Sequence, residues 1–163
     1  MAFQKRQIVP DIIKPREIIS ASPDDKIIDA ATKMVDAHVA ALVVFNSKKK
    51  LVGIVTERDM THRVVAKGLD PSTASVSKIM TKNPDTLSPD DFALEALNVM
   101  QSRHFRHLPV TDGSKVIGMV SIRDLFAAVK MSLEEDLKVK LFERHARGLT
   151  LTENGEYVYK TAH

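Results

Sequence analysis

One stretch of the sequence occurs twice, first as Gly53-Ile54-Val55-Thr56-Glu57-Arg58-Asp59 and then as Gly118-Met119-Val120-Ser121-Ile122-Arg123-Asp124. Each copy predicts a short apolar strand that turns directly into a helix, because a Ser or Thr followed three residues later by an acid is typical of a capping box. The start of a helix also presents free N–H groups and a positive dipole end to a phosphate. The motif is therefore open to two interpretations, a helix cap and a site that faces phosphate.

The motif lies inside a longer internal repeat. Ser22-Pro23-Asp24-Asp25 recurs 66 positions later as Ser88-Pro89-Asp90-Asp91. At the same offset, five further residues recur, namely Ala30, Met34, His38, Leu42 and Val44, which match Ala96, Met100, His104, Leu108 and Val110. One residue is then lost in a turn, so the Gly-to-Asp motif recurs at an offset of 65. Since internal repetition decides the architecture, we expect two copies of one structural unit.

Each copy predicts the same order of elements, β-α-β-β-α. In the first copy the strands are expected at Ile18–Ser20, Ala41–Phe45 and Leu51–Val55, the first helix begins at Ser22, and the second helix is expected at Glu57–Ala66. In the second copy the strands are expected at Asp85–Leu87, His107–Val110 and Val116–Val120, the first helix begins at Ser88, and the second helix is expected at Ile122–Lys130. Helical spacing predicts that the buried face of the first helix consists of Ile28, Ala31, Met34 and Val35, and in the second copy of Ala93, Ala96, Leu97 and Met100.

These patterns predict a mixed α/β fold of the α+β type. The two repeats are expected to pack as a pseudo-two-fold pair with two equivalent clefts, because each repeat has one sheet face to cover. We divide the chain into repeat 1 (8–67), a linker (68–76), repeat 2 (77–130) and a C-terminal helix and tail (131–163). Gly, Pro and Ser in the linker predict a flexible connection. The sequence Ser132-Leu133-Glu134-Glu135 predicts a capping box, from which an amphipathic helix starts and serves packing or self-association.

Composition excludes some classes of protein. The chain has 163 residues, enough for one solid core or two coupled ones, and no cysteine, which excludes a disulfide framework and a thiol nucleophile. The first residues do not resemble a secretory signal, and no apolar run approaches the length of about 18 residues that spans a bilayer, so a cytoplasmic protein is expected. A net charge of +3 does not call for nucleic acid.

Neither an enzyme nor a metal site is predicted. His104 and His107 lie three residues apart, but no further Cys or His completes a tetrahedral set. His38 and His104 follow the first helix of each copy, where a cation is favourable without any ligand. No nucleophile with an orienting partner can be identified, so no catalytic residue is assigned.

The two copies resemble the cystathionine-β-synthase (CBS) domain, and the pair resembles the tandem known as a Bateman module, over about residues 8–130. The resemblance rests on the order of elements, Ser-Pro-Asp before the first helix, Arg106-His107-Leu108-Pro109-Val110, and the repeated Gly-to-Asp motif. It implies a regulatory module whose clefts bind adenosine-containing ligands, most often AMP, ADP or ATP, and less often NAD(H) or S-adenosylmethionine. It further implies a homodimer of modules and a regulated protein that the sequence does not identify. A structural or oligomerisation protein without ligand is the alternative, and the presence of both aspartates and both hydroxyls favours the sensor.

The resemblance also assigns site residues. It implies that the motif Asp binds the ribose hydroxyls and that the Ser or Thr faces phosphate. Cleft A would consist of Arg106, His107, Ser121, Arg123 and Asp124 together with Ile13, Ile18, Ile19, Val39 and Ala40. Cleft B would consist of Thr56, Arg58 and Asp59 together with Met80, Thr81, Pro84, Asp85 and Phe105. Because Arg106 and His107 stand where the first copy has alanines, cleft A is expected to bind anionic nucleotides more tightly.

The tail has a resemblance of its own. Leu141 to Glu156 is similar to the wing and following helix of LysR-type transcription regulators, with Leu133–Leu137 as the end of a recognition helix. The first helices of that motif are missing, and Lys138 stands where the family has a helix-ending Gly, so the helix is expected to run on. Five Lys or Arg against six Asp or Glu in residues 131–163 give no basic patch. A DNA-associated regulator therefore remains an alternative that the charge does not favour.

Overall fold

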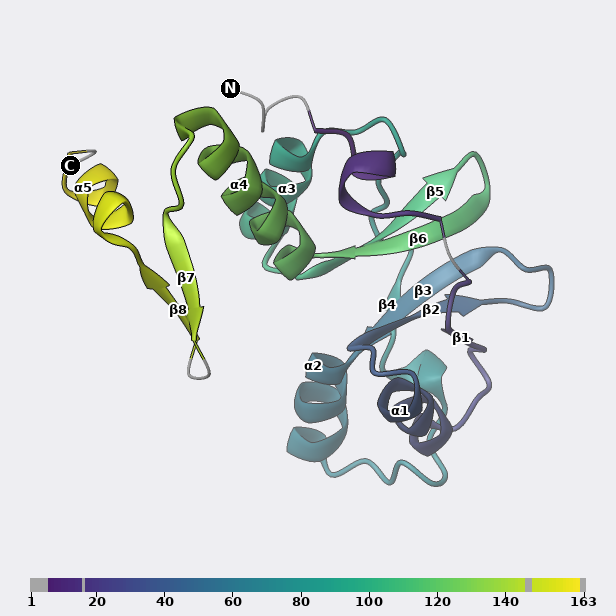
Figure 1. Cartoon of the computed structure of the whole chain (residues 1–163). Helices are drawn as coiled ribbons and strands as arrows, with labels where there is room; N and C mark the ends of the chain where they lie inside the picture. The colour runs from purple at the N-terminus through teal and green to yellow at the C-terminus, as the bar shows by residue number, and fades with distance from the viewer. Residues whose placement is uncertain (1–5, 16, 146–147, 162–163) are drawn as a thin grey trace. The chain divides into compact units, whose positions relative to one another are not determined.

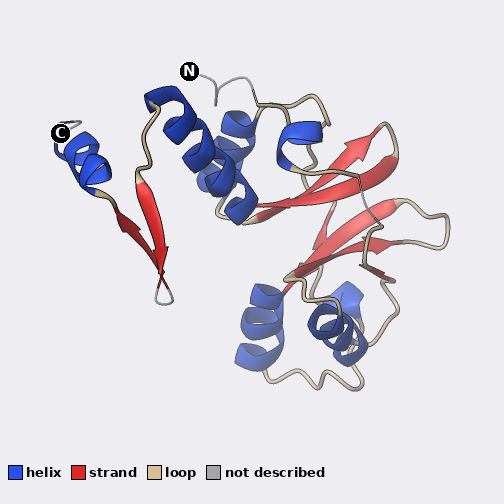
Figure 2. Cartoon of the chain, viewed as in Figure 1, coloured by secondary structure: helices blue, strands red, loops and turns tan. Residues whose placement is uncertain are grey.

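A computed structural model describes residues 6–15, 17–145 and 148–161, and these residues form two units. The sheet unit comprises the described residues within 14–89 and 107–120. The helical unit comprises those within 1–13, 90–106 and 121–163. Helices and strands both contribute, so the predicted mixed fold with two repeats is confirmed (Figure 2).

The sheet unit contains a four-stranded sheet in the order β1-β2-β3-β4 (Figure 1). The strands are β1 (Ser20–Ala21), β2 (Ala41–Phe45), β3 (Leu51–Thr56) and β4 (Thr81–Lys82). β1 pairs with β2 in parallel, whereas the other two pairs are antiparallel. The predicted hairpin between β2 and β3 is closed by Asn46, whose Oδ1 accepts backbone N–H groups of Lys48 and Lys50, each at 3.0 Å.

The second repeat contributes its own hairpin, β5 (His107–Asp112) and β6 (Lys115–Ser121). A parallel bridge joins Leu87 to Val110, just as Ala21 of β1 pairs with Val44 of β2. Since Leu87 and Val110 are the repeat equivalents of Ala21 and Val44, the strand pairing is reproduced in both copies. The repeat seen in the sequence therefore extends to backbone pairing.

One apolar core fills the first repeat. It is formed by buried residues of α1 (Ile27–Asp36), of β2 and β3, and of the helical segment that follows β3. That segment consists of α2 (Glu57–Asp59), a widened π turn η3 (Met60–Val64) and a 3-10 turn η4 (Val65–Lys67). The core residues are Ala21, Ile27, Ala30, Met34, Leu42, Val44, Val55, Val64, Ala74, Val76 and Ile79, the last two at the short turn η5 (Val76–Lys78).

The first helix begins later than the sequence predicts. Ser22 to Asp25 form a turn, in which the Ser22 N–H donates to Asp25 Oδ2 at 3.1 Å, and α1 starts at Ile27. The predicted buried face was wrong at two positions, because Ile28 is 42% exposed and Val35 is 70% exposed. The buried residues are Ile27, Ala30 and Met34. In the second repeat α3 likewise begins at Ala93 rather than at Ser88.

The linker between the repeats closes the first helix of repeat 1. The Ile27 N–H donates to the Ala74 carbonyl at 3.0 Å, and the Val76 N–H donates to the Asp25 carbonyl at 2.9 Å. Ala74 is buried as well. These bonds explain why the helix starts at Ile27, and they show that the linker, predicted to be flexible, is fastened to the turn before α1.

The start of the chain closes the first helix of repeat 2 in the same way. The Ala93 N–H donates to the Arg6 carbonyl at 2.9 Å, and the Ile8 N–H donates to the Asp91 carbonyl at 2.9 Å. Ile8, which opens the short turn η2 (Ile8–Ile12), is fully buried. Each repeat therefore closes its first helix with the segment that precedes the other repeat.

The helical unit contains α3 (Ala93–Arg103) and a 16-residue helix α4 (Ile122–Leu137). The prediction that a new helix starts at Ser132 was wrong, because Ser132 is fully buried within α4. Its Oγ accepts from Arg6 Nε at 2.6 Å, and Arg6 Nη2 binds Glu135 at 2.7 Å. Side chains that resemble a capping box therefore hold the N-terminal segment on α4 instead.

Beyond α4 the chain forms a hairpin and a last helix. Lys138 adopts a left-handed conformation with φ of 52°, so α4 ends there, contrary to the expectation that it runs on. β7 (Phe142–His145) pairs antiparallel with β8 (Gly148–Leu151), and α5 (Glu153–Thr161) follows (Figure 1). The likeness of this tail to a DNA-binding wing stays a prediction. Among the residues that the structure describes, no helix combines the length and apolar composition that crossing a bilayer requires.

Gly53 permits a close approach of the segment that follows the linker. A Cβ on Gly53 would lie 2.6 Å from Met80 Sδ and 3.2 Å from the Thr81 carbonyl oxygen. We expect Gly53→Ala to lower the free energy of unfolding by about 1–3 kcal/mol through overpacking, as measured by urea denaturation. In a Met80→Ala background the same substitution should cost less, because the nearest atom has been removed. An equal cost in both backgrounds would contradict this account.

Candidate functional site

The second motif is a complete capping box at the start of α4. Asp124 Oδ2 accepts from the Ser121 backbone N–H at 2.8 Å and from Ser121 Oγ at 2.6 Å. The Asp124 N–H donates back to Ser121 Oγ at 3.3 Å. The helix-cap interpretation is therefore confirmed for this copy, and the interpretation of the motif as a site that faces phosphate stays a prediction.

The first motif repeats the arrangement. Asp59 Oδ2 accepts from the Thr56 backbone N–H at 2.9 Å and from Thr56 Oγ1 at 2.8 Å, and the Asp59 N–H donates to Thr56 Oγ1 at 3.3 Å. Both carboxylates are thus oriented by their own hydroxyl, with one oxygen committed to the cap. Whatever else each carboxylate binds must use the other oxygen, Oδ1, because Oδ2 already accepts two hydrogen bonds.

The residue before β2 and the residue before β5 each accept a backbone hydrogen bond from a motif. The Glu57 N–H donates to the Ala40 carbonyl at 3.0 Å, and the Ile122 N–H donates to the Arg106 carbonyl at 2.9 Å. These pairs are equivalent in the repeat. Arg106, predicted for cleft A, therefore lies beside the second motif, whereas Ala40, also predicted for cleft A, lies beside the first motif.

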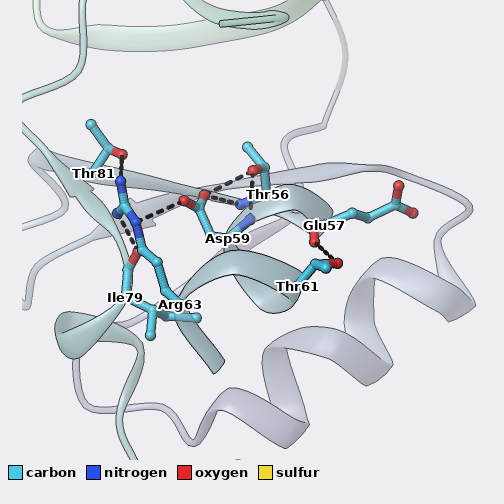
Figure 3. Close-up of polar contacts among 7 residues, drawn as sticks. All are labelled: Thr56, Glu57, Asp59, Thr61, Arg63, Ile79 and Thr81. Atoms are coloured by element: carbon cyan, nitrogen blue, oxygen red, sulfur yellow. Dashed lines mark hydrogen bonds and ion pairs between the residues drawn. The ribbon is translucent and has the colours of Figure 1, made fainter. Parts of the chain in front are cut away.

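The two carboxylates differ in their second oxygen. Asp59 Oδ1 lies 3.2 Å from Arg63 Nε, and the same guanidinium donates to the Ile79 carbonyl at 2.6 Å and to Thr81 Oγ1 at 3.3 Å (Figure 3). Asp124 Oδ1 has neither a hydrogen bond nor an ion pair within the described part of the chain. At the position equivalent to Arg63, the second copy has Ala128. The second motif therefore presents an oxygen that the first motif has already used.

Arg63 was missed by the sequence analysis. Its signal is present, because an Arg four residues after an Asp on a helix is a common intrahelical ion pair. The contacts with Ile79 and Thr81, which lie 16 and 18 residues further along the chain, had no such signal. Thr81 was predicted for cleft B together with Asp59, and Arg63 brings these two residues onto one guanidinium.

The remaining predicted residues of cleft B differ in their surroundings. Met80 contacts the backbone near Gly53, and β4 pairs Thr81 with Ile54 of β3. Arg58 and Asp85 are exposed, and Pro84 is half-buried in the loop after β4. Phe105 belongs to the helical unit, whereas the rest of cleft B belongs to the sheet unit. Most of the predicted set thus belongs to the sheet unit, and the cleft itself stays a prediction.

The residues predicted for cleft A are divided between the units. Ile13, Arg106, Ser121, Arg123 and Asp124 belong to the helical unit. Ile18, Ile19, Val39, Ala40 and His107 belong to the sheet unit. Of these, the structure connects Arg106, Ser121 and Asp124 through the start of α4. The full composition of the cleft stays a prediction.

The described residues show no metal centre. No three His, Cys, Asp or Glu side chains among them come together in a way that could hold a metal ion. Each motif holds an oriented carboxylate and a hydroxyl at the start of a helix. The carboxylate can accept from a diol, and the helix start can face an anion. The arrangement is therefore suited to binding groups of these two kinds.

Comparison with known proteins identifies the class. The CBS-domain sequence family matches residues 11–66 and again residues 76–131. The chain therefore belongs to the CBS-domain family, with two CBS domains in tandem as in a Bateman module. The CBS domain-containing protein CBSCBSPB2 of Arabidopsis thaliana is 37% identical over 125 residues, which cover 73% of this chain and 23% of that protein. The chain spans less than a quarter of the length of this plant relative.

Solved structures show the same fold. A protein with CBS domains from Burkholderia ambifaria is 35% identical, with a TM-score of 0.68 over 71% of this chain and 84% of that chain. A CBS domain protein of Pyrobaculum aerophilum, solved in complex with AMP, is 28% identical, with a TM-score of 0.63 over 69% of this chain and 86% of that chain. These structures share the fold of this chain over about 70% of its length.

The difference between the motifs predicts unequal stability effects. Asp59→Ala removes the carboxylate half of the capping box and also leaves Arg63 without its carboxylate, whereas Asp124→Ala removes only the carboxylate half of a capping box. We expect each cap to contribute about 0.5–2 kcal/mol to the free energy of unfolding, and Asp59→Ala to cost up to about 1 kcal/mol more. Urea denaturation of the two variants measures the difference. An Asp124→Ala variant that is the less stable of the two would contradict it.

Proposed function

We propose that this chain is a regulatory module that binds adenosine-containing nucleotides, in particular AMP, ADP or ATP, and that occupancy modulates a partner protein. The observation that carries the proposal is the Asp124 carboxylate. It is held by Ser121 at the start of α4, and its Oδ1 has no partner within the described residues. Such an oxygen can accept the hydroxyls of a ribose while the helix start faces the phosphate.

The relative from Pyrobaculum aerophilum supports the class of ligand, because that protein was solved with AMP. That protein is 28% identical to this chain, and the likeness covers 69% of this chain. NAD(H) and S-adenosylmethionine share the adenosine group, so they are weaker candidates for the same site. The module has no catalytic role in this proposal.

We further propose that the second motif is the tighter site. Arg106 lies beside it, since its carbonyl accepts from the Ile122 N–H, and the residue at the equivalent position of the first motif is Ala40. Arg106 is exposed, and a guanidinium that reached the start of α4 could pair with a phosphate oxygen in a charge-assisted contact, which is the stronger kind of hydrogen bond. His107 follows Arg106 and would add a donor.

The modules are proposed to act as homodimers and to regulate a separate or attached protein in the cytoplasm. No observation favours nucleic acid as a partner, and the exposed residues of α5 include Glu153 and Glu156 at its start. The tail is therefore proposed as a packing or partner-binding segment.

Nucleotide binding can be tested by thermal unfolding of nucleotide-stripped protein. A ligand that binds only the folded state stabilises it by RT ln(1 + [L]/Kd), about 2.7 kcal/mol at a hundredfold excess over Kd, so AMP should raise Tm. Asp124→Ala should weaken AMP binding by about 1.5–3 kcal/mol, measured by calorimetry, because a hydrogen bond to a charged group is lost. An unchanged Tm with millimolar AMP, ADP and ATP would favour the structural alternative instead.

The role of Arg106 can be tested separately. Arg106→Ala should weaken the tighter of two AMP-binding events by about ten- to a hundredfold and leave the weaker event unchanged. Neutral adenosine is the matched control, because it lacks the phosphate and its affinity should not respond to the substitution. If Arg58→Ala abolishes the tight event while Arg106→Ala spares it, the first motif is the principal site.

A further inference from the structure

Arg63 connects the first motif to a segment that lies some 20 residues further along the chain. Its guanidinium lies 3.2 Å from Asp59 Oδ1 and donates to the Ile79 carbonyl and to Thr81 Oγ1 (Figure 3). Asp59 lies on α2, whereas Ile79 and Thr81 lie just before and in β4. One side chain thus ties the motif helix to the segment 79–81.

We propose that the Arg63 guanidinium occupies part of the nucleotide site at the first motif. A nucleotide then binds there only when Arg63 releases its contacts with the motif and with the segment 79–81. The proposal rests on the proposed function, because it concerns the same site. It assigns to Arg63 the control of affinity at that site and the coupling of occupancy to the segment 79–81.

The acceptor capacity of Asp59 makes the competition direct. A carboxylate offers about four lone-pair sites, and the two of Asp59 Oδ2 are taken by the Thr56 N–H and by Thr56 Oγ1. Asp59 Oδ1 lies 3.2 Å from Arg63 Nε in an ion pair. A ribose diol presents two donors, which would need both sites of Oδ1, where the guanidinium lies. One existing contact must therefore yield, and the two from Thr56 are part of the helix cap. Arg63 is the contact that can leave without opening the cap.

The exposure of the ion pair makes it replaceable. The Arg63 side chain is 40% exposed, whereas the Asp59 side chain is 13% exposed. A displaced guanidinium would therefore reach water, and a partly exposed ion pair is worth little compared with a buried one. The carboxylate, in contrast, is sheltered and needs a replacement donor, which a ribose supplies.

The local backbone of the first copy differs from that of the second. Arg63 lies in the widened π turn η3, whereas the equivalent Ala128 lies in the regular helix α4 and is buried. π turns occur frequently at functional positions. The repeats are therefore alike in the capping box and differ in the residue four positions later, which is where the proposal places the control.

The test uses Arg63→Met in an Asp124→Ala background, so that AMP binding reports the first motif. We expect AMP affinity to rise about threefold to fivefold, the change that a partly exposed ion pair represents. Adenosine affinity should rise at least as much, because adenosine has no phosphate for the arginine to attract. Lys67→Met is the matched control, since it removes an exposed positive charge from the same helical segment and should leave affinity unchanged.

A second measurement requires no ligand. Amide hydrogen exchange of residues 79–82 should be faster in Arg63→Met than in Lys67→Met, because the tie to the motif helix is lost. Arg63→Lys covers the case in which the Met variant does not fold. An ammonium can pair with Asp59 but cannot bridge all three acceptors as a guanidinium does, so affinity and exchange should lie between those of wild type and Arg63→Met.

The outcomes separate the two proposals. If the wild-type chain binds neither AMP nor adenosine, the proposed function fails and this inference fails with it. If the wild type binds AMP but Arg63→Met binds with equal or lower affinity in the Asp124→Ala background, or if exchange at 79–82 is unchanged, only the role of Arg63 is overturned. Weaker AMP binding by both Arg63 variants would show that Arg63 is itself a nucleotide ligand.

Discussion

The hydrogen bonds between a hydroxyl and the carboxylate three residues later are the interaction on which both repeats depend. They lie where β3 or β6 ends and the helix begins, and they fix the direction of the Asp side chain. The first residue of each helix also donates a backbone hydrogen bond to the residue before β2 or β5. The interaction that shapes the fold therefore also orients the group proposed to bind nucleotide, and stability and binding share the same atoms.

The sequence predicted the features that local residue types determine. The repeat, both hairpins and both capping boxes follow from spacing and turn residues such as Asn46, and their positions agree with the structure to within two residues. It failed where distant segments decide. The start of α1 depends on a bond to Ala74, and Ser132, which lies within α4, binds Arg6 instead of starting a helix. Arg63 escaped notice because two of its three partners lie in another part of the chain.

The two motifs show how duplication can divide one task. Their capping bonds and the backbone bond at each helix start correspond. Positions beside these bonds differ, such as Arg63 against Ala128 and Ala40 against Arg106. Because these side chains contact the carboxylate or neighbour the helix start, single substitutions can alter affinity in one copy without disturbing the scaffold of either.

The exchange of closing segments means that the repeats as counted along the sequence are not the units that close in space. Residues 74–76 complete the first helix of one repeat, and residues 6–8 complete that of the other. A gene fragment that encoded either repeat by itself would lack the piece that seals its helix. Insertions, deletions and recombination that preserve the fold must therefore keep each first helix together with its closing segment, although the two lie in different repeats or in the linker.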